Sequence, residues 1–74
     1  MSKVPRVDAK QLIKIVEKLG FKLVRQSDSH MIYKNEKGIR LTIPYHSGKT
    51  IHPKIVTSVL NDADLSADEF KKLL

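Results

Sequence analysis

The first pattern of apolar residues in the chain has the period of an α-helix. Its members fall on one helical stripe: Leu12, Ile13, Val16 and Leu19. Asp8 and Gln11 have the spacing of a capping box, and Gly20 stands where a left-handed residue ends a helix. We therefore predict a helix over residues 8–19, with Phe21 folding back on its last turn.

After this helix the apolar period shortens to two, as in β-strands. The pattern predicts strands over residues 21–25, 29–34 and 39–43, with a turn at 26–28 and a hairpin loop at 35–38. The third strand alternates between apolar and polar residues, which indicates one covered and one open sheet face. The second strand is apolar on both faces, which a central position explains.

Pro44 is expected to end the sheet, because it has no N–H to donate to a ladder. After a polar loop at 45–50, Pro53 suits the first turn of a second helix, with His52 or Thr50 near its cap. The predicted apolar stripe of this helix comprises Ile55, Val56, Val59 and Leu60.

Ser66 and Glu69 form a second capping box, which predicts a short terminal helix. Residues 1–7 are expected to be a loose lead-in to a single domain that spans 1–74. The expected fold class is α+β in the order α-β-β-β-α. It has a three-stranded antiparallel sheet covered on one face by two helices, plus the short C-terminal helix.

The composition agrees with a small globular domain. The chain has 74 residues, of which 41% are hydrophobic and 30% charged, so it has room for one domain only. It contains no cysteine, so no disulfide can stabilise its fold. A reducing cytoplasmic location is therefore expected. No apolar run is long enough for a signal peptide or a membrane span, and no membrane partner is expected.

The charge distribution points to a polyanionic partner. Residues 1–60 carry twelve basic and four acidic side chains, net +8, whereas residues 61–74 carry two basic and four acidic, net −2. Nucleic acid is the first candidate for a strongly basic body of this size. The alternative is a surface that serves only solubility.

The motifs of metal, phosphate-loop and serine-nucleophile sites are all missing from the sequence. We therefore expect no metal and no small-molecule cofactor. Three histidines in a basic chain remain, and they suit cleavage of RNA without a metal ion. In that reaction the substrate's 2′-hydroxyl is the nucleophile, while the protein moves protons and offsets the charge on the phosphorane.

His30 is the first candidate for the catalytic acid or base, because it begins a strand beside a turn. Ser27 and Ser29 are candidate hydrogen-bonding neighbours, and Arg25 and Lys34 are near enough to border it. The alternative interpretation is a structural or solvated histidine.

The other two histidines have competing interpretations. His46 is a candidate phosphate ligand or second acid/base group, or else a residue that only hydrogen-bonds its own turn. His52 is favoured as a helix cap. Tyr33 and Tyr45 are candidates for base stacking, with core packing as the alternative. The candidate phosphate track, whose members are otherwise solvated cations, comprises Lys34, Lys37, Arg40, Lys49 and Lys54.

Across residues 9–74 the sequence resembles the HicA (YcfA-like) toxin family. The most specific part is the order and spacing of a Ser-His pair and a later Pro-x-His. The segments that carry the resemblance are Gly20-Phe21, Arg25-Gln26-x-x-Ser29-His30-x-Ile32-Tyr33, Ile43-Pro44-x-His46-Ser47-Gly48-Lys49 and Leu65-Ser66-x-x-Glu69-Phe70.

This resemblance implies a fold similar to the double-stranded-RNA-binding domain. It also implies an mRNA interferase that cleaves single-stranded mRNA and arrests translation, and a HicB-like antitoxin that covers its active site. The free chain is expected to be a monomer. The family's catalytic histidine lies in a Gly-Ser-His motif and maps onto His30, and Asp28 stands where that motif has glycine. The aspartate adds negative charge beside His30, and it is a candidate partner for Arg25.

Two other functions remain as alternatives. The first is a non-catalytic RNA-binding module, although such a module usually has a lysine cluster at the start of its second helix, where Lys54 stands alone. The second is a protein-interaction domain whose basic face meets an acidic partner.

Overall fold

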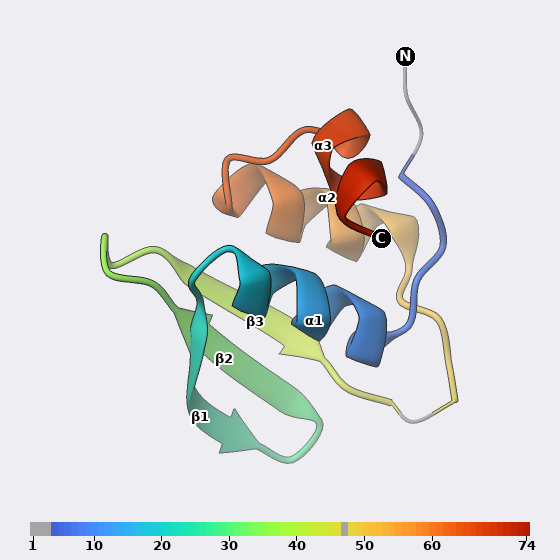
Figure 1. Cartoon of the computed structure of the whole chain (residues 1–74). Coiled ribbons are helices and arrows are strands. Elements are labelled where there is room, and N and C mark those ends of the chain that lie inside the picture. Colours follow the sequence, from blue (N-terminus) through green and yellow to red (C-terminus); the bar gives the residue numbers. More distant parts are fainter. Residues whose placement is uncertain (1–3, 47) are drawn as a thin grey trace.

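The computed structural model describes residues 4–46 and 48–74. Its three strands form one antiparallel sheet in the order β1-β2-β3, so β2 is central, as predicted. The elements are α1 (Ala9–Lys18), β1 (Lys22–Ser27), β2 (His30–Lys34), β3 (Arg40–Pro44), α2 (Pro53–Asp62) and α3 (Ala67–Leu73). In Figure 1, α1 lies in front of the sheet, α2 lies on its β3 side, and α3 packs above them. The predicted α+β fold class and element order are confirmed.

The core fills the space between the helices and one face of the sheet. The helices α1 and α2 contribute apolar residues at helical spacing, and β2 and β3 contribute residues of one face only. Its members include Leu12, Ile15, Val16, Tyr33, Leu41, Ile43, Val56, Val59, Leu60 and Phe70. Phe70 is the one residue of α3 in the core, so it anchors that short helix.

The predicted ends of α1 are confirmed. The Asp8 carboxylate accepts from the Gln11 N–H at 2.8 Å, and the Gln11 side chain accepts from the Asp8 N–H at 3.0 Å. At the other end Gly20 has φ 97, and the Phe21 N–H donates to the Val16 carbonyl at 3.0 Å. This is the Schellman arrangement, and it buries Phe21 and fixes the direction in which β1 leaves the helix.

Three sequence predictions about the elements are corrected. The predicted apolar stripe of α1 includes Leu19, but this side chain is 36% exposed, and Ile15 is buried instead. β1 continues to Ser27, so the β1–β2 turn consists of Asp28 and Ser29 rather than residues 26–28. The strand is longer because its ladder with β2 continues through the Gln26–Met31 and Ser27–His30 pairs. The predicted apolar stripe of α2 includes Ile55, but this side chain is 38% exposed, since it lies beside β3 at the sheet edge.

The segment before α1 is held more firmly than predicted. Val7 is buried, and the Ile51 N–H donates to its carbonyl at 2.8 Å. Asp8 and Thr50 form an isolated antiparallel bridge next to this bond. The entries to α1 and α2 are therefore tied together, while residues 1–3 of the expected lead-in lie outside the described part.

Candidate nucleic-acid interface

The strand registers define the face of the sheet that α1 does not cover. Successive residues of a strand point to opposite faces, and directly paired residues share a face. Tyr33, Leu41 and Ile43 are buried on the covered face. The other face, called the open face below, has three cross-strand rows: Ser27–His30–Pro44, Arg25–Ile32–Thr42 and Lys22–Lys34–Arg40.

The open face is cationic. It has four basic side chains, one imidazole and no carboxylate among its nine residues. Lys22, Lys34 and Arg40 lie side by side across all three strands, and each is exposed. Like charges directly opposite each other destabilise a sheet. An anion bound across this row would relieve that repulsion.

A β-bulge at Val24 brings two of these cations to the same face. Leu23 pairs with Tyr33 and Arg25 pairs with Ile32, so Val24 is an extra residue in the ladder. Lys22 and Arg25 are three residues apart and would lie on opposite faces of a regular strand. Because of the bulge, Lys22 shares the open face with Arg25, which lies one cross-strand row away from His30.

His30 is the first residue of β2 and is exposed. It pairs with Ser27 on one side and Pro44 on the other. Among the described residues, no hydrogen bond engages its imidazole. The ring is therefore free to contact a ligand on the open face, with Arg25 as its diagonal neighbour.

The turn before His30 contains a strained residue. Asp28 has φ 50, in the left-handed region that glycine adopts most easily. In two-residue hairpin turns, glycine is favoured at the first central position when that residue has a positive φ. This backbone conformation explains why glycine suits the position in the motif that the resemblance implies. Asp28 adopts the same conformation at some cost in stability. Ser29 follows it, and its carbonyl accepts from the Tyr45 N–H.

The residues after β3 lie at the end of the sheet. The His46 side chain is exposed, and its carbonyl accepts from the Lys49 N–H at 3.1 Å in a turn where Gly48 has φ 77. Lys49 and His52 line a hollow of about 130 Å³ together with His46. Lys49 therefore lies outside the three rows of the open face, and Ser47 lies outside the described residues.

The structure decides two of the alternatives left by the sequence. The His52 Nδ1 atom accepts from the Lys54 N–H at 3.1 Å, so His52 is the N-cap of α2. Tyr33 is 2% exposed on the covered face, where it cannot stack on a nucleic-acid base. Burial, with a smaller contribution from the negative charge of Glu17, raises the pKa of Tyr33 above its ordinary value.

Arg25, His30, Lys34 and Arg40 were predicted as site residues and lie together on the open face. The sequence prediction missed Lys22 and Thr42. The alternation of the third strand, with Thr42 on the same face as Arg40, was a usable signal for Thr42. The position of Lys22 depends on the bulge, for which the sequence has no clear signal.

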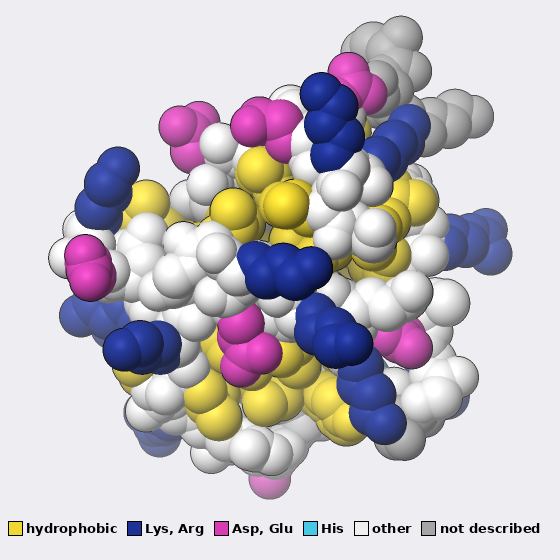
Figure 2. Space-filling view, viewed as in Figure 1, with side chains coloured by type: hydrophobic (Ala, Val, Ile, Leu, Met, Phe, Trp, Pro, Cys, Tyr) yellow, Lys and Arg dark blue, Asp and Glu magenta, His cyan; other side chains and the backbone are white. Residues whose placement is uncertain are grey.

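The opposite side of the molecule has a different surface. Figure 2 shows the side that bears α1, where basic and acidic side chains are interspersed and no histidine is visible. Within residues 4–46 and 48–74 there is no cluster of three potential metal-ligating side chains. In the same part of the chain, no helix has the length and apolar character to cross a membrane.

Comparison with known proteins identifies the family. No functionally curated protein matches the chain. The family of the HicA toxin of bacterial toxin-antitoxin systems matches residues 9–65, a range that includes α1, the whole sheet, α2 and all three histidines. The match covers most of the 74-residue chain, and therefore the protein belongs to the HicA toxin family.

Proposed function

We propose that this protein is an mRNA interferase, an endoribonuclease that cleaves single-stranded mRNA without a metal ion and thereby arrests translation. The observation that carries the proposal is the open face. It combines an unengaged, exposed imidazole with four cations and no carboxylate, in a chain of the HicA toxin family. Such a surface attracts a polyanion and holds a proton-transfer group next to it.

The chemistry needs only groups that this face offers. A base removes the proton of the 2′-hydroxyl, the 2′-oxygen attacks the adjacent phosphorus, and the 5′-oxygen leaves with a proton from an acid. His30 is the proposed acid/base residue. Arg25, one row away, is placed to offset the charge that builds on the phosphorane oxygens.

The remaining cations would hold the RNA backbone. Lys34 lies four residues from His30 along β2, which corresponds to about 13 Å at the rise of a strand. The row of Lys22, Lys34 and Arg40 therefore binds phosphates at a distance from the scissile bond. The nine open-face residues include no Phe, Tyr or Trp, so phosphate contacts rather than base stacking dominate the proposed binding.

A HicB-like antitoxin is the proposed protein partner. A cationic face of this kind is complementary to an acidic surface, and a partner seated on it would exclude RNA from His30. We propose that the free chain is a cytoplasmic monomer and that its activity depends on release from this partner.

Cleavage of a labelled single-stranded RNA in EDTA tests the function. We expect the wild-type chain to cleave and His30→Ala to be slower by about 10² to 10⁴, the usual contribution of a positioned acid or base. His52→Asn is the matched control, since it removes an imidazole but keeps a good N-cap residue. Loss of wild-type cleavage on chelation, or equal cleavage by wild type and His30→Ala, would contradict the proposal. Salt-sensitive RNA binding without any cleavage would favour a binding module instead.

A further inference from the structure

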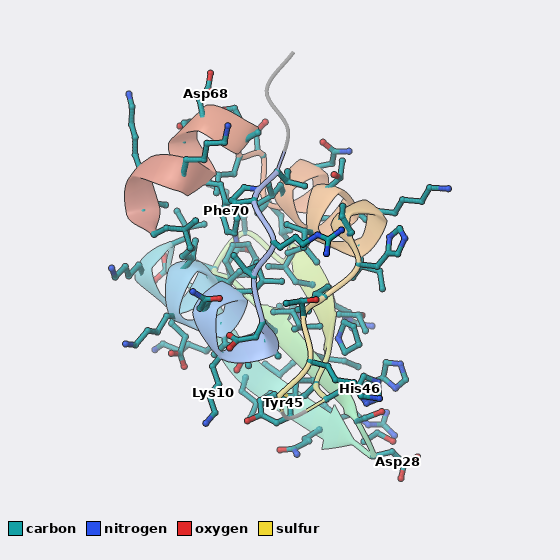
Figure 3. The ribbon with its side chains drawn as sticks, turned by 90° about the vertical axis from the view of Figure 1, so that its right-hand side faces the viewer. Lys10, Asp28, Tyr45, His46, Asp68 and Phe70 are labelled. Carbon is teal, nitrogen blue, oxygen red and sulfur yellow. The ribbon has the colours of Figure 1, made fainter. Side chains whose placement is uncertain are left out.

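The β2–β3 ladder extends one step beyond the named strands. His30 pairs with Pro44, and the Tyr45 N–H donates to the Ser29 carbonyl just outside that pair. The chain therefore stays beside β2 up to the residue that precedes His46. Figure 3 shows the consequence: His46 lies on the same side of the sheet end as Asp28, and Tyr45 points the other way, toward Lys10.

This arrangement makes His46 the diagonal neighbour of His30. Diagonal positions across an antiparallel ladder lie on the order of 7–8 Å apart. At that separation two imidazole rings can approach one phosphodiester from its two sides. Lys34, the amine on the same strand as His30, lies about 13 Å from His30 along that strand, too far to share the same phosphate.

The His46 side chain is available for such a role. It is exposed, and among the described residues its imidazole has no hydrogen-bond partner, while its backbone is held by the bond from the Lys49 N–H. The backbone carbonyl of His46 therefore makes the hydrogen bond of the turn, and the side chain is not needed for it. Within residues 4–46 and 48–74, nothing gives the imidazole a structural role.

Several charged or titratable groups lie around His46. Asp8 and Lys10 of the α1 entry line a hollow of about 260 Å³ with it. Lys49 and His52 line the smaller hollow on its other side. Asp28 completes the set at the end of the ladder, as Figure 3 shows.

We propose that His46 is the second proton-transfer group of RNA cleavage, an inference that rests on the proposed function. One of the two histidines accepts the 2′-hydroxyl proton as the bond from the 2′-oxygen to phosphorus forms. The other donates a proton to the 5′-oxygen as its bond to phosphorus breaks. The products are a 2′,3′-cyclic phosphate and a 5′-hydroxyl, and the proton count balances between the two rings.

The test compares ordinary RNA with RNA whose scissile 5′-oxygen is replaced by sulfur. A thiolate leaves without protonation far more readily than an alkoxide, because a thiol has a pKa of about 8.5. The loss of a general acid is therefore rescued by the sulfur substrate, whereas the loss of a base or of correct folding is not.

We expect His46→Ala and His46→Asn to slow cleavage of ordinary RNA by about 10² to 10⁴. On the sulfur substrate, one of the two alanine variants, His46→Ala or His30→Ala, is expected to recover a cleavage rate within tenfold of wild type. Rescue of His46→Ala makes His46 the acid, and rescue of His30→Ala makes His46 the base; either supports the pair. His52→Asn is the control histidine and is expected to match wild type on both substrates.

Other results overturn the inference. If His46→Ala cleaves ordinary RNA as fast as wild type while His30→Ala is inactive, the second group is not His46, and the proposed function still stands. If both alanine variants stay inactive on the sulfur substrate, neither ring is the proton donor and the pairing is wrong. If wild type itself does not cleave, or His30→Ala remains active, the proposed function fails together with the inference.

Discussion

Ser27 and His30 face each other across the two-residue turn that joins β1 to β2. The turn consists of Asp28 and Ser29, and its conformation determines how the two partners are presented on the open face. Because His30 is the first residue of its strand, any change in this turn alters the backbone directly beside the proposed catalytic ring.

Replacing Asp28 with glycine is expected to stabilise the fold and to favour RNA binding. Asp28 has φ 50, and an L-residue loses about 1 kcal/mol in this region that glycine does not lose. Removal of its carboxylate also takes a negative charge from the neighbourhood of His30, which should tighten RNA binding about twofold to threefold at low salt. Urea unfolding and fluorescence anisotropy measure the two effects.

Asp64→Gly is the matched control for this substitution. Asp64 also has a left-handed backbone, φ 57, but it follows α2 at a helix end far along the chain from the turn. We expect Asp64→Gly to stabilise the fold by a similar amount without changing RNA affinity. Equal RNA affinities for wild type and Asp28→Gly would show that the Asp28 charge does not act on the bound RNA.

Most of the fold followed from local signals in the sequence. The capping box at Asp8, the left-handed Gly20 and the proline at the start of α2 each act within one or two turns, so their effects are readable from neighbouring residues. The central position of β2 also followed, because a strand that is apolar on both faces fits the interior of a sheet better than its edge.

The arrangement of the open face was harder to predict. Whether Lys22 shares a face with Arg25 and His30 depends on the extra residue at Val24, and a bulge depends on the pairing of whole strands. Likewise, His46 could be placed next to His30 only through the bond from Tyr45 to Ser29, which joins residues distant in sequence. Long-range pairing has no signature in local composition.

The cationic row across the three strands should carry much of the salt dependence of RNA binding. In a cleavage-deficient His30→Ala background, Lys34→Gln and Arg40→Gln are each expected to reduce the slope of log Kobs against log salt by about 0.7. Lys72→Gln on α3 is the control, since Lys72 lies outside the open face. An unchanged slope for both row variants would place the RNA on another surface.

Two single-residue deletions in β1 test whether the reaction needs Arg25 on the open face. Deleting Val24 removes the extra residue but keeps Arg25 opposite Ile32, so cleavage is expected to stay within about threefold of wild type. Deleting Gln26 instead lets Val24 take the place opposite Ile32 and turns Arg25 to the other face.

The Gln26 deletion is therefore expected to lose as much activity as Arg25→Gln, about 10² for a group that stabilises charge in the transition state. Every residue of β1 is exposed, so neither deletion removes a core side chain, and circular dichroism shows whether both shortened chains keep the fold. Equal activity of the two deletion variants would mean that the face on which Arg25 lies has no effect on the reaction.

Tyr33 should make the fold less stable at alkaline pH. Burial raises the pKa of Tyr33 in the folded chain, so the folded state holds its proton more tightly than the unfolded state. The resulting stability is fully present below the ordinary tyrosine pKa of about 10 and is lost as the pH rises through the raised value. Urea unfolding between pH 8 and 11 should show this loss in wild type.

Tyr33→Phe is expected to lose less stability over the same pH range, because no buried phenol must ionise. Tyr45→Phe, at a half-buried position, is the control and should follow the wild-type curve. A parallel decline of all three proteins would assign the alkaline transition to other groups, such as the lysines.

The bulge at Val24 has a second consequence, for self-association of the chain. β1 is an edge strand that exposes Leu23 and Val24 at 44% and 57%, and a regular edge of this kind can template the addition of a strand from another molecule. The extra residue interrupts the even row of free N–H and C=O groups along that edge, so a second copy cannot pair with it in register. The residue that brings Lys22 to the open face thus also protects the edge strand from aggregation.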